Sequence, residues 1–256
     1  MSPRGVLTVY RLQLLMYRTR VNAAASVKIK NNLLAITLIF TSLPPSIRVS
    51  KVLIEEISYA IGQNLGAGSD RPELGLTAIH CATTLLQTSL RTSPTSLSAA
   101  PTPSPTLQHL ALHLISPLIA FVAEAVATSS AQDLSPLTLE GVKQVIKGLV
   151  GWTSGLPEPS RPKGYGVLLP TLSLLLDDGD SSAQPSGLHL IATTTMLGLA
   201  QNAPGAFKDA TQAMDESDRG RLERAVRDAV GQRAERLQAG AGSAEAKKVI
   251  ELRSFG

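Results

Sequence analysis

Residues 107–126 read LQHLALHLISPLIAFVAEAV, and this stretch indicates the fold class more directly than any other part of the chain. Its apolar side chains recur at the i, i+3, i+4, i+7 spacing of one face of an α-helix. They are Leu107, Leu110, Ala111, Leu114, Ile115, Leu118, Ile119, Val122 and Val126. Other faces of the same helix are also apolar, so we expect neighbouring helices to cover it on two sides. Pro117 is expected to kink this helix or to split it in two.

Similar apolar runs occur on both sides of this stretch. The five runs begin near Leu33, Leu74, Leu107, Val142 and Leu188. They follow one another at intervals of roughly 35 to 45 residues, which is typical of HEAT and armadillo helical-pair repeats. No segment shows a sustained strand alternation. We therefore predict an all-α fold, a HEAT/armadillo-like helical-repeat solenoid.

Proline, glycine and serine indicate where the individual helices begin and end. We expect helices at residues 46–64, 72–89, 136–155, 165–176, 186–202 and 215–237. In the helix at 46–64, the residues expected on the buried side are Val49, Val52, Leu53, Ile57 and Ile61. The helix at 215–237 has many charged residues and is expected to close the solenoid. Leu222, Val226 and Val230 should face inward there, and Arg224 should face solvent.

The organisation along the chain has three expected parts. Residues 1–25 form a basic N-terminal segment that is poorly ordered or partly helical, residues 26–237 form the solenoid, and residues 238–256 form a C-terminal tail. A run of Ser, Thr, Pro and Ala at residues 92–105 has too few apolar side chains to pack, so we expect a mobile loop there.

Charge is distributed unevenly over the 256 residues, whose net charge is +4. Residues 1–54 contain eight Lys and Arg residues and no acidic residue. Such a segment is compatible with a mitochondrial presequence, a basic patch for a phosphate-rich partner, or one solvated face of a helix. The longest apolar run appears at Leu33 to Leu43, and its eleven residues are fewer than the ~20 that a membrane span needs. We therefore expect no membrane-spanning segment.

Several residues were candidates for chemistry, and for each one the surrounding sequence favours a structural role. Cys81, the only cysteine, lies in an apolar run and is expected to be a small buried side chain. His109 and His113 have the i, i+4 spacing of a helical metal pair but have no predictable third ligand. Trp152 is expected in the core.

Two loop sequences also lack the residues that their chemistry requires. Asp177, Asp178 and Asp180 resemble the start of a calcium loop without its fixed Gly and terminal Glu. The glycines between Gly62 and Gly68 follow a helix rather than a strand, and no Lys-Ser/Thr pair follows them. We therefore predict no catalytic, cofactor-binding or metal-binding residues, and a protein that is not an enzyme.

The C-terminal third resembles a known family. The segments that carry the resemblance are LAQNAPGAFK at 199–208, RLE at 221–223, AVR at 225–227 and IELRSFG at 250–256. They are similar to the C-terminal end of the HEAT repeat-containing protein 5 family, and the resemblance covers residues 74–256. Members of this family are very long solenoids that act as accessory factors of the clathrin adaptor at the trans-Golgi network and endosomes. Because family members are several times longer, the resemblance implies that the chain is a terminal fragment or an aberrant gene model.

The resemblance supplies the functional expectation, whereas the helical pattern supplies only the architecture. It implies a non-enzymatic interaction scaffold in vesicle trafficking between Golgi and endosomes, with proteins such as clathrin-adaptor subunits as partners and no cofactor. We expect no nucleic-acid partner and only indirect, peripheral membrane association of a cytoplasmic protein. The alternative is a helical protein that is imported into mitochondria through its basic N-terminus.

Overall fold

The computed structural model describes residues 26–43, 47, 49–66, 71–90, 105–129, 134–176 and 186–231, and the regular elements within these ranges are all helical. The chain divides into two compact units, Met1–Leu174 and Leu175–Gly256. The expected N-terminal segment at 1–25 and the tail at 238–256 lie outside the described residues, as does nearly all of the expected loop at 92–105. These domain limits therefore stay predictions.

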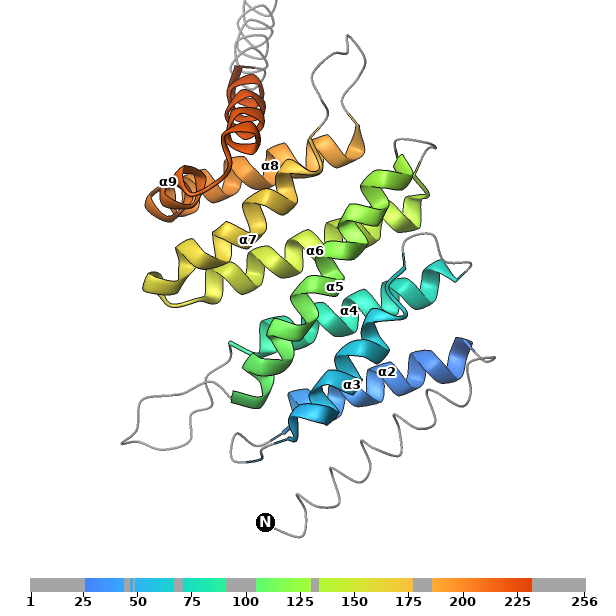
Figure 1. Ribbon diagram of the computed structural model, residues 1–256. Coiled ribbons are helices and arrows are strands. Elements are labelled where there is room, and N and C mark those ends of the chain that lie inside the picture. Colours follow the sequence, from blue (N-terminus) through green and yellow to red (C-terminus); the bar gives the residue numbers. More distant parts are fainter. Residues whose placement is uncertain are drawn as a thin grey trace, which may run out of the picture. The chain divides into compact units, whose positions relative to one another are not determined.

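The first unit is built from helices in two layers (Figure 1). Its elements are α2 (Ser26–Thr41), α3 (Lys51–Gly62), α4 (Pro72–Thr88), α5 (Pro105–Ser129), α6 (Pro136–Gly155), a short 3-10 helix (Glu158–Ser160) and α7 (Arg161–Ser173). Helices α2, α4 and α6 pack side by side in one layer, and α3, α5 and α7 form the other. From α3 to α7, consecutive helices also pack across the layers. This stacking of helical pairs confirms the predicted all-α, helical-repeat fold.

The repeat interval inferred from the sequence was wrong, although the fold class was right. The five apolar runs belong to α2, α4, α5, α6 and α8, and of these only α2, α4 and α6 share one layer, where they begin at residues 26, 72 and 136. Equivalent helices are further apart, since α3, α5 and α7 begin at residues 51, 105 and 161. The runs at α4 and α5 were counted as two repeats, but they are two helices of adjoining layers.

Serine residues begin three of the helices. The hydroxyls of Ser50, Ser135 and Ser186 accept hydrogen bonds from backbone N–H groups three residues later, at distances of 3.3, 3.1 and 3.1 Å. Each bond satisfies one of the N–H groups that have no partner within the helix, which stabilises a helix by about 1 kcal/mol. The predicted start of α6 at Ser135-Pro136 and its end at Gly155 are confirmed.

Helix α5 is the central helix of the first unit. It contacts α3, α4, α6 and α7, and Leu110, Leu114, Leu118 and Val122 are fully buried. The helix continues through Pro117, so the expected split does not occur. The neighbouring helices do not cover every apolar side chain of α5, because the side chain of Leu112 is 63% exposed.

Length and composition alone would allow one described helix, Thr106–Ser129, to cross a membrane. The choice of Leu33 to Leu43 as the longest apolar stretch overlooked this helix, whereas length and composition alone do not decide the expectation that no segment spans a membrane. That choice considered only uninterrupted apolar runs, and it ignored the run that continues past His109, His113 and Pro117. A core helix of a soluble protein has the same length and composition.

Two expected helix starts differ from the structure by four or five residues. Helix α3 begins at Lys51, so Val49 precedes the helix, and Val52 is 65% exposed rather than buried. The other expected core residues of α3 are buried. Helix α7 begins at Arg161, four residues before the predicted start at Tyr165, because the 3-10 helix at Glu158–Ser160 leads directly into it.

The second unit contains α8 (Gly187–Asn202), α9 (Pro204–Gln212) and a further helical segment at 216–231. In that segment Leu222 and Ala225 are buried and Arg224 is exposed, whereas Val226 is half-buried and Val230 is 53% exposed. The inward orientation expected of Val230 was therefore wrong. Residues at i, i+4 and i+8 drift by about 80° around a helix, which turns Val230 away from the face that Leu222 occupies.

Candidate functional site

A polar groove lies between α4 and α6 on the layer that also contains α2. We call it the α4–α6 groove, and its volume is about 330 Å³. Its lining residues are His80, Thr83, Thr84 and Gln87 from α4, and Glu140, Lys143, Gln144, Lys147 and Gly148 from α6. The α4 residues recur at i, i+3, i+4 and i+7, and so do the first four α6 residues. Both sets are therefore polar stripes of neighbouring helices that face a common space.

A close approach of the two helices forms the floor of the groove. A Cβ atom on Gly148 would lie 2.4 Å from Cγ2 and 2.8 Å from Cβ of Thr83, so only glycine fits there without a shift. Gly141 and Gly155, seven residues before and after, would make similar contacts of 2.9 Å with Phe121 and 2.7 Å with Leu90. The three glycines are thus spaced by seven residues along α6, and each contacts a side chain of a neighbouring segment.

The walls of the groove carry side chains that can bind a partner. Among the described residues, no hydrogen bond engages the side-chain amides of Gln87 and Gln144, and no ion pair engages Lys147. The Gln87 amide extends towards α6, because its Nε2 lies 3.0 Å from the position that a Cβ of Gly151 would take. Lys143 pairs with Glu140 at 3.9 Å between Nζ and Oε2. The lining therefore contains two lysines and one carboxylate.

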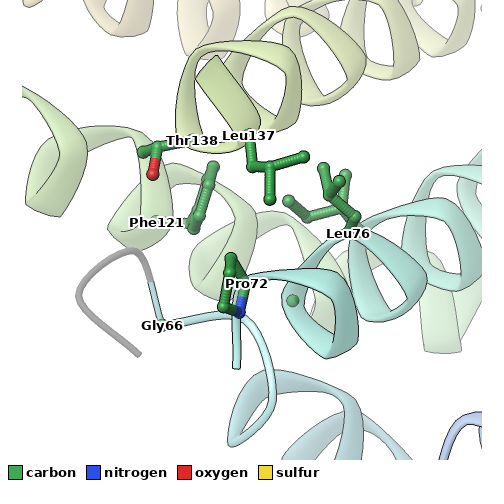
Figure 2. Close-up of a pocket in the computed structure, with 8 residues that line it drawn as sticks. Gly66, Pro72, Leu76, Phe121, Leu137 and Thr138 are labelled. Atoms are coloured by element: carbon green, nitrogen blue, oxygen red, sulfur yellow. The ribbon is translucent and has the colours of Figure 1, made fainter. Parts of the chain in front are cut away.

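A second hollow lies where α4, α5 and α6 meet, and apolar side chains line it together with Thr138 (Figure 2). Leu76 and Leu137 extend towards each other, while Phe121 and Pro72 line the same hollow. Its volume is about 10 Å³, which is room for about one water molecule. The hollow is thus too small for an organic ligand, and the α4–α6 groove is the better candidate site.

The structure describes the surroundings of the individual residues that the sequence offered as candidates for chemistry. His109 and His113 lie 3.2 Å apart between their Nε2 atoms, but the described residues contain no group of three or more potential metal ligands. Cys81 is fully buried, and burial raises the pKa of its thiol, partly opposed by a hydrogen bond from Thr37. Trp152 is 8% exposed, as predicted for a core residue.

The aspartate-rich loop after α7 and the glycine-rich loop after α3 lie wholly or partly outside the described residues. Asp177, Asp178 and Asp180 lie outside the described residues. Gly62 ends α3 and Gly66 is described, whereas residues 67–70 are not. The predictions that these loops bind no calcium and no phosphate therefore stay untested.

Sequence reasoning missed the α4–α6 groove. Its two walls are more than fifty residues apart in the chain, and neither contains a recognisable motif. The available signals were the polar stripe on each helix, opposite its apolar stripe, and the heptad spacing of Gly141, Gly148 and Gly155. These signals identify close helix packing but not which helix is the neighbour.

The two-layer stacking of helical pairs defines a helical-repeat protein, a class whose extended surfaces bind other proteins. A family model described as LAA1-like, C-terminal TPR repeats, matches residues 53–239. The chain therefore belongs to the LAA1-like family, which is the HEAT repeat-containing protein 5 family that its C-terminal third resembles. No curated protein and no solved structure matches the chain.

The match extends the family assignment beyond the segments that suggested it. It begins in α3, some twenty residues before the stretch covered by the resemblance, and it ends shortly after the helical segment at 216–231. The family description names TPR repeats, whereas the sequence predicted HEAT or armadillo repeats. Both types stack antiparallel helical pairs, which is the architecture of the first unit.

Proposed function

We propose that this chain is a non-enzymatic interaction scaffold that acts as an accessory factor in clathrin-adaptor vesicle trafficking between Golgi and endosomes. Membership of the LAA1-like family carries this proposal. The α4–α6 groove supports it, because its polar walls offer unengaged amides and a lysine without an ion-pair partner in the described residues. A cytoplasmic protein that reaches Golgi or endosomal membranes through its partners fits this role.

A binding measurement with purified components tests the proposal. The full chain is immobilised on a biosensor, and a purified clathrin-adaptor complex of the trans-Golgi network is passed over it. We expect saturable binding that Lys147→Glu changes if the groove takes part. Absence of binding at micromolar adaptor concentrations would refute the adaptor as a direct partner.

One observation supports the mitochondrial alternative: residues 1–54 contain eight basic residues and no acidic residue. A fluorescent protein fused to the C-terminus of the full chain separates the two functions. Punctate signal that overlaps Golgi or endosomal markers supports the trafficking role. Signal in mitochondria that is lost when residues 1–25 are deleted supports import instead.

A further inference from the structure

We propose that the α4–α6 groove binds an extended, acidic segment of a partner protein. Gln87 and Gln144 form hydrogen bonds with the main chain of this segment, and Lys147 forms an ion pair with one of its acidic side chains. This inference rests on the proposed scaffold function and specifies the chemistry of the partner. It follows from the groove's polar lining, its length and its charge.

The side-chain amides of the groove match the hydrogen-bonding groups of a polypeptide backbone. Each primary amide offers two N–H donors and one carbonyl acceptor, and each peptide unit offers one N–H and one C=O. Gln87 is on one wall and Gln144 on the other, and among the described residues neither amide has a partner. A strand of peptide between them therefore gains hydrogen bonds on both sides without breaking bonds within the protein.

The groove is long enough for a short extended segment. Seven residues separate His80 from Gln87 on α4, and the same number separates Glu140 from Lys147 on α6. At 1.5 Å per helical residue, each wall is about 10 Å long. This length accommodates about three residues of extended chain.

The lining excludes an amphipathic helix as the occupant. Such a helix binds through an apolar face and needs apolar anchors in its groove. Its own backbone groups are already hydrogen-bonded within the helix, so they would leave the Gln87 and Gln144 amides without partners. The groove offers polar side chains on both walls, and its floor is the contact between Thr83 and Gly148.

The charge of the groove selects an acidic segment. Glu140 is within 3.9 Å of Lys143, and both side chains are about half exposed. Lys147, one turn further along α6, has no carboxylate partner among the described residues. A carboxylate or a phosphorylated side chain placed beside Lys147 therefore completes an ion pair, whereas a lysine placed there would be repelled.

Selection from a defined peptide library tests the inference. A phage-displayed library of random twelve-residue peptides is selected on the full chain, and the enriched peptides are synthesised with a fluorescein label and measured by fluorescence anisotropy. We expect enriched sequences that contain Asp or Glu and lack the i, i+3, i+4 apolar spacing of a helix. Enrichment of amphipathic-helical or basic peptides, or of none, would overturn the inference.

Variants of the groove then locate the binding site. Gln144→Ala should weaken binding by about three- to tenfold, as expected for lost hydrogen bonds to a peptide main chain, and Lys147→Glu by about tenfold or more, as expected for a lost bond to a charged group. Gln108→Ala on α5 and Lys163→Glu on α7 are matched controls on exposed positions outside the groove, and they should change affinity less than about twofold. Circular dichroism checks that every variant is folded. Equal effects of groove and control variants would contradict the assignment.

The same variants separate this inference from the proposed function. If the adaptor complex binds the wild-type chain and the Lys147→Glu variant equally well, the trafficking role stands and the groove inference fails. If acidic peptides bind at the groove but the adaptor complex does not bind at all, the groove inference stands and the adaptor proposal fails.

Discussion

Replacing Gly148 with alanine should destabilise the first unit, although the same change usually stabilises a helix. Alanine favours the helical state by about 0.8–1.0 kcal/mol relative to glycine. In the folded chain, however, the new Cβ would meet Cγ2 of Thr83 at 2.4 Å and its Cβ at 2.8 Å. Overpacking of this kind costs about 1–3 kcal/mol, so the free energy of unfolding should fall by about 0–2 kcal/mol.

Gly166 in α7 provides a matched control for this substitution. It is exposed, and a Cβ added there would have no neighbour within 4 Å. Gly166→Ala should therefore raise the free energy of unfolding by about 0.8–1.0 kcal/mol. The two variants undergo the same chemical change, so the difference between them, about 1–3 kcal/mol, measures the close approach of α4 and α6.

Urea unfolding followed by tryptophan fluorescence is the assay. Trp152 is the only tryptophan in the chain, and it lies in α6 one turn after Gly148, so its signal reports the first unit. Thr83→Ala removes the nearer of the two contacts and should reduce the cost of Gly148→Ala in a double-mutant cycle. The reasoning is refuted if Gly148→Ala stabilises the protein as much as Gly166→Ala does.

Three further predictions concern burial. Burial raises the pKa of the Cys81 thiol, so the folded chain keeps this proton at a pH where the unfolded chain releases it. The free energy of unfolding should therefore fall as pH rises above about 9. Urea titrations between about pH 7 and 10.5 should show a smaller fall for Cys81→Ala. On α2, Leu33→Lys should lower the free energy of unfolding by about 3 kcal/mol or more in the same assay, since Leu33 is fully buried. Leu38→Lys should change the free energy of unfolding by less than about 0.5 kcal/mol, because Leu38 is 67% exposed. In the second unit, Leu222→Asp should lower the melting temperature, followed by circular dichroism, by several degrees. Arg224→Ala, at an exposed position, should leave the melting temperature nearly unchanged. Equal effects of the two variants would mean that the helical segment at 216–231 does not pack through Leu222.

The helices themselves could be predicted from the sequence because their signals are local. The apolar stripe of α5, the Ser135-Pro136 start of α6 and the buried face of α4 depend only on residues within a few turns. The arrangement of helices in layers could not be predicted in this way. Five apolar runs looked like one repeating unit, because nothing local distinguishes α4 from α5 as members of different layers.

The groove depends on contacts between distant parts of the chain, which explains why sequence reasoning missed it. Gln87 and Gln144 are ordinary exposed helix residues when each helix is read alone. They become a site only because Gly148 allows α6 to approach Thr83 of α4. The exposure of Val230 has a different origin, because it follows from the local drift of i, i+4 and i+8 positions around a helix.

Site-specific photo-crosslinking tests most directly whether this scaffold binds a partner protein through the α4–α6 groove. The photoreactive amino acid p-benzoylphenylalanine replaces Gln144 in the groove or Gln108 on α5, and each variant is irradiated with the purified adaptor complex. We expect a cross-linked adaptor subunit from position 144 and none from position 108. Cross-links of equal yield from both positions, or from position 108 alone, would contradict binding through the groove.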